Sequence, residues 1–286
     1  YNNKIYTTST MEKFDLTVIG TGPGGYVAAI RAAQLGMNVA VIERDRPGGV
    51  CLNWGCIPSK AILKCAEVYQ YFKHSEQFGI EHTGLKYDFS KVIDKSRGAS
   101  DTLTKGVEFL LKKNKITLIR GTGKLIANNK VGVTQEKGQI EVESDKILIA
   151  TGSVPVTLPG LEVDGKLIMT SDEAIFYKEV PPSVVVIGGG YIGAEFAYVY
   201  NSFGSKVTIV EMLDHLIPGA DEDVSRELEK SFKKAGMDVL TATKFKEVKK
   251  KKKTVDVVLE KLSDKSEVTV SAAMVLVAVG RRPIAN

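Results

Sequence analysis

The sequence predicts an α/β fold made of two successive units of the same design, each with a parallel sheet between two outer layers. An apolar strand, a glycine-rich turn, an apolar helix and a second apolar strand follow one another twice. Each turn contains G-x-G-x-x-G, and each copy ends in an acid 23 residues after its first glycine (Glu43 after Gly20, Glu211 after Gly188). A strand before the motif, a helix after it and this acid are the context of dinucleotide binding, so both units are predicted to be Rossmann-like.

The elements of the two copies correspond one to one. The first copy has strands at Asp15–Ile19 and Val39–Ile42, with a helix at Tyr26–Leu35 that Gly36 ends. The second copy has strands at Ser183–Ile187 and Val207–Val210, with a helix at Ala194–Phe203 that Gly204 ends.

The motif glycines have separate physical roles. The first permits the tight turn, the second lets a pyrophosphate approach the backbone, and the third lets the helix pack closely on the strand. The helix N-terminus then stabilises the phosphate charge. A carboxylate after the second strand accepts hydrogen bonds from ribose hydroxyls and repels a 2′-phosphate, so the second site is predicted to prefer NAD over NADP. The residues concerned are Gly20, Gly22, Gly25, Glu43, Gly188, Gly190, Gly193 and Glu211.

The chain between the two copies is predicted in less detail. Helices are expected at Ile57–Phe72 and at Phe89–Lys113, the latter broken or bent near Gly98. Strands of a meander are expected at Ile116–Ile119, Lys124–Ile126 and Val131–Val133, and a buried strand at Lys146–Ala150. Pro155 and Pro159-Gly160 indicate a linker. The predicted domains are therefore a tail at 1–10, a first nucleotide-binding domain at 11–157 and a second at 158–286.

After the second copy, residues Asp221–Lys234 predict an amphipathic helix whose acidic start suits the helix dipole. Residues 245–248 and 254–258 are predicted to form a hairpin, and Met274–Val279 a final buried strand.

The composition is that of an ordinary globular protein. The chain has 286 residues, 43% of them hydrophobic and 26% charged, and a net charge of +5. No apolar run approaches the ~20 residues of a membrane span. Five lysines at 249–253 suggest a solvated turn rather than a contact with a polyanion, and nothing else favours nucleic-acid binding. No metal site is expected. The Thr/Ser-rich tail suggests either the remnant of an organellar transit peptide or residues left from an expression vector.

Two cysteines predict redox chemistry. Cys51 and Cys56 are five positions apart, directly before a predicted helix, and Cys65 is the third cysteine of the chain. A helix N-terminus lowers the pKa of a cysteine beside it, which favours a working dithiol over a structural disulfide. Two dinucleotide sites around one dithiol imply a flavin and a nicotinamide.

These features resemble the pyridine nucleotide-disulfide oxidoreductases over Phe14–Pro283. The resemblance rests on Gly48-Gly49, Cys51-Leu52-Asn53, Gly55 to Lys60, Ala150-Thr151-Gly152, Gly188 to Gly193 with Glu195, and Val279 to Pro283. Within the family, the Ile57-Pro58-Ser59-Lys60 ending is most similar to the dihydrolipoamide dehydrogenase branch, the flavoprotein component of the 2-oxo acid dehydrogenase and glycine cleavage complexes. The resemblance thus implies oxidation of dihydrolipoamide on a lipoyl domain, with electrons passing through FAD to NAD⁺.

The resemblance also implies roles for individual residues. Cys51 is the thiol that exchanges with the lipoyl sulfurs, and Cys56 lies against the flavin. Lys60 lies near the flavin and pairs with Glu195 beside the nicotinamide. These four are the expected catalytic residues. Besides the motif glycines, the two acids, Cys51 and Lys60, the expected cofactor-binding residues are Pro23, Gly24, Gly49, Val50, Gly123, Ala150, Thr151, Gly152, Tyr191, Ile192 and Gly280.

Two residues depart from the family pattern, and one segment of it is missing. Val50 stands where the family usually has Thr, and Trp54 where it usually has a smaller aliphatic residue. The family continues beyond this sequence with a segment that completes the flavin site and an interface domain that supplies a catalytic His-Glu pair. His74, His82 and His215 match no part of that pair, and His215 is expected to be a surface or loop residue. We therefore expect a C-terminally incomplete chain with little activity of its own, and a homodimer only in the full-length protein.

Three readings of function remain at this point. The first is lipoamide chemistry in the mitochondrial matrix, with a plastid or a bacterial-type cytoplasm as the alternative location. The second is another dithiol reductase of the family, similar to the glutathione or mercuric reductases. The third is an inactive nucleotide-binding fragment.

Overall fold

The computed structural model describes residues 12–285, so the predicted tail at 1–10 lies outside the described residues. The chain forms two compact units. Unit 1 contains the residues up to Ile57, Gly98–Ser153 and the residues from Pro283 onward. Unit 2 contains Pro58–Arg97 and Val154–Arg282. The predicted α/β fold with two dinucleotide-binding units is confirmed; the predicted boundary at 157/158 stays a prediction.

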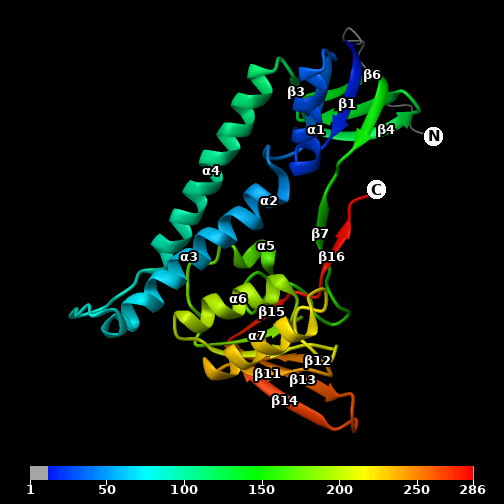
Figure 1. The fold of residues 1–286 in the computed structure, drawn as a ribbon. Coiled ribbons are helices and arrows are strands. Elements are labelled where there is room, and N and C mark those ends of the chain that lie inside the picture. The colour runs from blue at the N-terminus through cyan, green and yellow to red at the C-terminus, as the bar shows by residue number, and fades with distance from the viewer. Residues whose placement is uncertain (1–11, 286) are drawn as a thin grey trace. The chain divides into compact units, whose positions relative to one another are not determined.

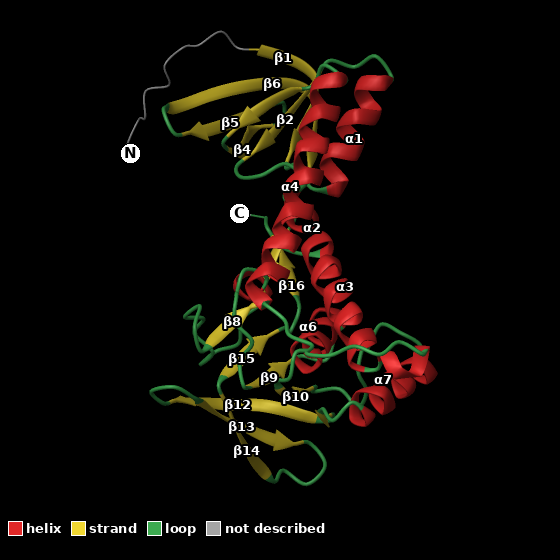
Figure 2. Ribbon diagram, turned by 90° about the vertical axis from the view of Figure 1, so that its left-hand side faces the viewer, coloured by secondary structure: helices red, strands yellow, loops and turns green. Residues whose placement is uncertain are grey.

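Unit 1 is built on a six-stranded sheet with the order β3-β2-β1-β6-β5-β4. The first four are parallel, and β6, β5 and β4 form an antiparallel meander (Figure 2). The strands are β1 (Glu12–Ile19), β2 (Val39–Glu43), β3 (Thr117–Arg120), β4 (Thr122–Ala127), β5 (Lys130–Gln135) and β6 (Gly138–Ile149). The helices are α1 (Pro23–Gln34) and α2 (Gly49–Asn53), with the start of α3 (Cys56–Lys73) and most of α4 (Phe89–Lys113).

The alternation of side chains along β2 explains the three layers of unit 1. Val39 and Val41 face a cluster that includes Ala29 of α1 and Leu111 of α4. Ala40 and Ile42 point the other way, into a cluster with residues of β5 and β6. Successive side chains of a strand point to opposite faces, so a strand buried on both faces reads as a continuous apolar run. The parallel strands therefore lie between the helices and the meander.

Two expectations for this unit were wrong. Ile116–Ile119 was expected in the meander, but β3 pairs in parallel with β2, because a strand that follows a long crossover helix returns in parallel. The helix at 89–113 was expected to break or bend near Gly98; the break is absent, because α4 is one continuous helix through that position (Figure 1). An internal glycine costs a helix only about 1 kcal/mol, which the flanking turns of this 25-residue helix offset.

Unit 2 contains a five-stranded parallel sheet with the order β11-β10-β9-β15-β8 and an antiparallel sheet with the order β12-β13-β14. The strands are β8 (Ile168–Thr170), β9 (Ser183–Ile187), β10 (Lys206–Val210), β11 (Asp238–Leu240), β12 (Thr243–Lys250), β13 (Val255–Lys261), β14 (Glu267–Ala272) and β15 (Met274–Val277). Its helices are α5 (Ser171–Ala174), α6 (Tyr191–Ser202) and α7 (Glu222–Lys234), with the 3-10 turn η1 (Ser75–Phe78). The short strands β7 (Ser153–Pro155) and β16 (Arg281–Pro283) pair with each other.

The core of unit 2 lies between its two sheets. Val185 and Val275 of the parallel sheet pack against Val257 and Leu259 of the antiparallel sheet, and all four are fully buried. The predicted hairpin is confirmed as β12 and β13. Its five lysines are exposed, as expected of a solvated turn, and three of them form ion pairs with Glu247, Asp164 and Asp256.

A cluster of aromatic side chains fixes the end of α3 within unit 2. The rings of Tyr69, Tyr87 and Phe89 lie 5.0–5.2 Å from the ring of Phe203. The hydroxyl of Tyr87 also donates to the Phe203 carbonyl oxygen at 2.9 Å. Contacts at these distances are typical of stabilising aromatic pairs. Residues more than 100 positions apart in the sequence therefore form one structural element.

None of the helices within residues 12–285 combines the length and the apolarity needed to cross a membrane.

Candidate nucleotide and dithiol sites

The first and third glycines of both motifs are required by close backbone packing. A Cβ on Gly25 would lie 2.0 Å from the carbonyl oxygen of Gly20, and one on Gly193 would lie 1.9 Å from that of Gly188. Gly20 and Gly188 have φ of 100° and 107°, and a Cβ on either would lie within 2.5 Å of a backbone carbonyl oxygen. The third glycine lies inside the first turn of its helix, which explains why α1 and α6 begin three residues earlier than predicted.

The second glycines border open space. A Cβ on Gly190 would have no atom within 4 Å, and one on Gly22 would meet only the Cα of Gly49, at 3.9 Å. Gly22 and Gly190 are also the N-caps of α1 and α6, and neither cap has a side chain that binds the first amide groups. Amides at a helix N-terminus that bind no capping side chain, with room in front of them, form a cradle for an anion. Both turns therefore fit the pyrophosphate of a dinucleotide.

The two acids are bound to their turns in the same way. Glu211 accepts hydrogen bonds from the amides of Gly189 (2.6 Å) and Leu213 (2.9 Å). Glu43 accepts from the amides of Thr21 and Asp45, both at 2.9 Å, and also from the Thr21 hydroxyl at 2.5 Å. Both carboxylates are more than 90% buried. Because amide groups hold each carboxylate in place, its remaining lone pairs have a fixed direction for a ribose.

The dithiol loop packs on the first glycine-rich turn. The amide of Gly48 donates to the Thr21 carbonyl oxygen at 2.8 Å, and a Cβ on Gly49 would lie 2.6 Å from the Cα of Gly22. Gly48 and Gly49 have φ of 98° and 57°, in the left-handed region that glycine adopts without strain. The loop that carries Cys51 therefore lies directly against the predicted flavin turn.

The cysteines occupy different positions in this loop. Cys51 is half-buried in the middle of α2, while Cys56 is exposed and is the first residue of α3, one residue before the predicted start at Ile57. Trp54 ends α2 and is half-buried. Cys65 lies further along α3, where burial raises the pKa of its thiol although Lys95 opposes the shift. Cys65 is therefore less reactive than an ordinary cysteine.

Lys60 and Glu195 form the ion pair expected from the resemblance. The Nζ of Lys60 lies 2.5 Å from Oε1 of Glu195, and both residues belong to unit 2. The pairing is confirmed; the catalytic roles of the two residues stay predictions.

The other predicted cofactor residues lie beside the glycine turns or in nearby loops. Pro23 and Gly24 are in the first turn of α1, and Tyr191 and Ile192 in that of α6. Val50 is half-buried in α2. Thr151 follows β6, and its hydroxyl donates to the Ile284 carbonyl oxygen at 2.5 Å. The remaining residues of this set are Ala150, which donates its amide to Ile19; Gly152 and Gly280, with φ of 76° and 120°; and Gly123, where a Cβ would contact Ile19 and Ile42.

None of the three histidines was assigned a catalytic role from the sequence, and two of them have identified contacts. His215 lies in the loop after Glu211, as expected, where its ring binds Asp214 and lowers the pKa of that carboxyl group. His82 contacts the carbonyl oxygen of Phe72.

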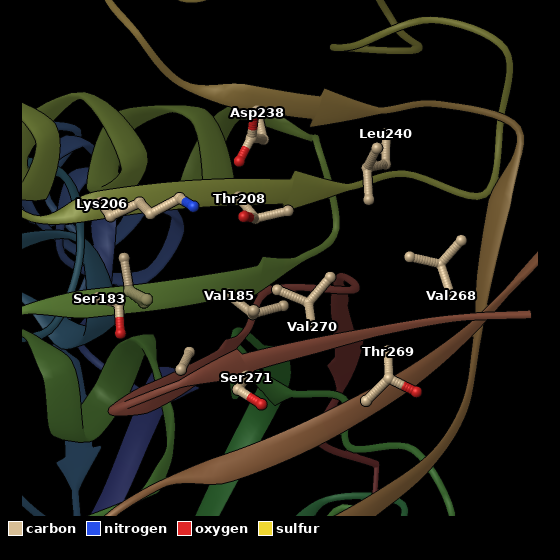
Figure 3. Close-up of a pocket in the computed structure, with 12 residues that line it drawn as sticks. Ser183, Val185, Lys206, Thr208, Asp238, Leu240, Val268, Thr269, Val270 and Ser271 are labelled. Atoms are coloured by element: carbon tan, nitrogen blue, oxygen red, sulfur yellow. The ribbon is translucent and has the colours of Figure 1, made fainter.

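A separate crevice lies between the two sheets of unit 2. It has a volume of about 390 Å³ and is lined by residues such as Ser183, Lys206, Asp238 and Val270 (Figure 3). Ser183, Lys206 and Asp238 are the first residues of β9, β10 and β11, whereas nucleotides bind at the carboxyl ends of parallel strands. The crevice is therefore not the predicted nucleotide site.

Comparison with known proteins agrees with this geometry. Residues 14–286 match the family model described as pyridine nucleotide-disulphide oxidoreductase. The chain belongs to the pyridine nucleotide-disulphide oxidoreductases. A dihydrolipoyl dehydrogenase from Bacillus subtilis is 42% identical, over 94% of this chain and 59% of the relative. A dihydrolipoyl dehydrogenase from Mycobacterium bovis is 44% identical, over 96% of this chain and 58% of the relative. The chain thus spans little more than half the length of these relatives.

Solved structures of family members show the same fold. LpdA from Mycobacterium tuberculosis superposes with a TM-score of 0.85 at 28% identity, over 94% of this chain and 59% of that one. The flavoprotein disulfide reductase RclA from Escherichia coli, in its Cu(II) complex, superposes with a TM-score of 0.81 at 28% identity. The match covers 96% of this chain and 58% of RclA. This chain is therefore similar in fold to a flavoprotein disulfide reductase over 96% of its length.

Proposed function

We propose that this protein is a flavoprotein that oxidises dihydrolipoamide, carried on the lipoyl domains of 2-oxo acid dehydrogenase or glycine cleavage complexes, and delivers the electrons to NAD⁺. The observation that carries the proposal is the packing of the Cys51 loop on the first glycine-rich turn. The amide of Gly48 donates to the Thr21 carbonyl oxygen in that turn, and Gly49 can approach Gly22 only because Gly49 has no Cβ. The similarity to dihydrolipoyl dehydrogenases supports the choice of substrate.

The two cysteines perform the thiol chemistry in this proposal. With Cys51 and Cys56 joined in a disulfide, one lipoyl thiolate attacks the Cys51 sulfur, and Cys56 leaves as a thiolate. The second lipoyl thiolate then attacks the lipoyl sulfur bound to Cys51, which releases the lipoyl disulfide and a Cys51 thiolate. Two electrons and no atoms of the lipoyl chain pass to the protein. Cys56 is exposed at the first residue of α3, and Cys51 is half-buried in α2, so the two sulfurs of this exchange lie on successive helices.

The cofactors fit the glycine turns. The amides at the start of α1 and the Glu43 carboxylate would hold FAD, and those at the start of α6 and Glu211 would hold NAD⁺. When bound, FAD supplies the two-electron relay between the dithiol and the nicotinamide. Residues 211–220 contain two acids and no Lys or Arg, so the loop offers a 2′-phosphate only repulsion. This loop supports NAD⁺ over NADP⁺.

A cysteine substitution with a matched control tests the proposal. Cys51→Ser in the full-length protein keeps its bound flavin and loses turnover with dihydrolipoamide and NAD⁺. Cys65→Ser, a second half-buried cysteine on a helix, keeps its turnover. Turnover in the Cys51→Ser protein would refute the thiol assignment. Faster reaction with glutathione disulfide and NADPH than with lipoamide and NADH would instead favour a different reductase of the family.

A further inference from the structure

One face of α4 is polar where it meets the dithiol loop. Asp101, Thr104 and Glu108 follow one another at spacings of three and four residues, so they lie on the same side of the helix. All three belong to unit 1, as does the loop from Asp45 to Asn53. Each of the three side chains binds either this loop or an arginine that holds it.

The central contact joins Thr104 to Asn53, two residues after Cys51. The Thr104 hydroxyl donates to Oδ1 of Asn53 at 3.0 Å. The side-chain Nδ2 of Asn53 donates to the carbonyl oxygens of Pro47 (3.1 Å) and Gly49 (3.0 Å). The hydrogen bond from Asn53 to Gly49 closes the backbone segment that contains Cys51. Asn53 thus fixes the conformation of the loop from inside, and Thr104 fixes Asn53.

Two weaker contacts flank this centre. Arg46 pairs with Asp101, and both side chains are about half exposed. Arg120 binds Glu108 at 2.7 Å and donates to the Asp45 carbonyl oxygen at 2.5 Å. Exposed ion pairs contribute little to stability, whereas Asn53 and Thr104 are only 1% and 4% exposed. The buried pair is therefore the dominant part of this attachment, because a buried group that loses its partner finds no water to replace it.

We infer that Asn53 and Thr104 are positioning residues that set the redox equilibrium of the Cys51–Cys56 pair by holding the dithiol loop in the conformation that the disulfide requires. This inference rests on the proposed function, because it takes Cys51 and Cys56 as a working dithiol. Neither residue touches the reacting sulfurs in this proposal. They act through the backbone of α2, in which Cys51 lies between the two ends of the hydrogen bond from Asn53 to Gly49.

The direction of the effect follows from loop entropy. In the disulfide form, the S–S bond itself restrains residues 51–56. In the dithiol form no covalent bond crosses the loop, so its restraint comes from non-covalent contacts, among them the buried hydrogen bonds of Thr104 and Asn53. Without them the reduced loop samples more conformations, and closing the disulfide costs more entropy. Loss of the hydrogen bond therefore shifts the equilibrium toward the dithiol.

Equilibration of the full-length protein with glutathione measures this shift. Two electrons pass from the two thiols to glutathione disulfide, one S–S bond forms between Cys51 and Cys56, and two glutathione molecules are released. For Thr104→Val, which removes the hydroxyl and keeps the shape, we expect the equilibrium constant for disulfide formation to fall about 3- to 10-fold, as for one buried hydrogen bond. Thr104→Ala provides the same loss of the hydroxyl without a β-branched side chain in the helix.

Two further variants separate positioning from folding. Thr104→Ser restores the hydroxyl and returns the constant to the wild-type value. Thr102→Val makes the same change at an exposed position of α4, where the hydroxyl donates to the Gly98 carbonyl oxygen, and leaves the constant unchanged. A purely structural role would lower the melting temperature of Thr104→Val and Thr104→Ala with no change in the constant, and that result would overturn the inference.

The equilibrium separates this inference from the proposed function on which it rests. If the wild-type protein forms no Cys51–Cys56 disulfide with glutathione, the dithiol assignment and the inference both fail. If the disulfide forms with the same constant in the wild type and in the Thr104 variants, only the inference fails.

Discussion

Replacing Gly25 with alanine tests the packing that brings α1 onto β1. The new Cβ would lie 2.0 Å from the Gly20 carbonyl oxygen and 3.0 Å from its carbon, whereas non-bonded carbon atoms pack at about 3.5–4.0 Å. The carbonyl cannot yield easily, because the Gly20 amide binds the Ile42 carbonyl oxygen at 2.8 Å and fixes the turn to β2. Helix and strand therefore have to separate at this point.

The expected change in the free energy of unfolding is the cost of overpacking minus the gain in helix propensity. Overpacking of this kind costs about 3 kcal/mol, at the upper end of the usual range. An alanine in a helix recovers about 0.5–1 kcal/mol relative to glycine. We expect Gly25→Ala to lower the free energy of unfolding of unit 1 by about 2 kcal/mol, which is about 1 M in the urea midpoint at an m-value of about 2 kcal/mol per M.

Gly24→Ala is the matched control for this experiment. Gly24 lies in the same first turn of α1, and a Cβ there would have no atom within 4 Å, so its stability is expected to stay the same or rise slightly. Trp54 is the single tryptophan and belongs to unit 1, so its emission follows the unfolding of that unit in protein without flavin. Equal urea midpoints for the two variants would refute the argument that Gly25 is required by packing.

Three other predictions concern the cofactors and the stability of unit 2. Addition of FAD is expected to quench the emission of Trp54 strongly, because Trp54 ends the helix that carries Cys51; unchanged emission would place the flavin elsewhere. Glu211→Gln removes the charge that repels a 2′-phosphate, so the ratio of KM for NADPH to KM for NADH is expected to fall about tenfold, while Glu43→Gln leaves this ratio unchanged. The Asp164 carboxyl has its pKa lowered: burial opposes the shift, but hydrogen bonds from the Ile168 amide, Lys250 and two further amides outweigh it. Its stabilising effect is therefore present above the unfolded-state pKa of about 4 and is lost as the pH falls below it, so calorimetry is expected to show a melting temperature of unit 2 that falls less steeply below pH 4 in Asp164→Asn than in the wild type.

The fold was predicted most accurately at positions where only one type of residue can meet the physical requirement. Gly25 and Gly193 have no alternative at their positions, and the spacing of Glu43 and Glu211 follows from the length of one strand-turn-helix-strand unit. The helix that starts at Cys56 was predicted to within one residue, at Ile57, from a local signal.

Other features depend on contacts that a local pattern does not contain. The pairing of β3 with β2 and the 12-residue length of β6 are set by tertiary neighbours, since β6 pairs with β1 on one side and with β5 on the other. Thr104 was missed because a single threonine in a polar helix face carries no signal of its own. Asn53 stands between the two cysteines, and its position in that motif was the one indication of a role.

The aromatic cluster around Phe203 has a consequence for synthesis on the ribosome. Tyr69 and Tyr87 are made more than 100 residues before the ring on which they pack, so this part of unit 2 stays without its partner until Phe203 has been translated. Strand pairing in unit 1 is delayed in a similar way, because β1 cannot pair with β6 until β6 has been translated. Long sequence separation of native contacts slows folding and prolongs the exposure of apolar surface. The segment from Tyr69 to Phe89 therefore lacks its packing partner until Phe203 is made, and release of a chain that ends before Phe203 would leave this segment open to aggregation.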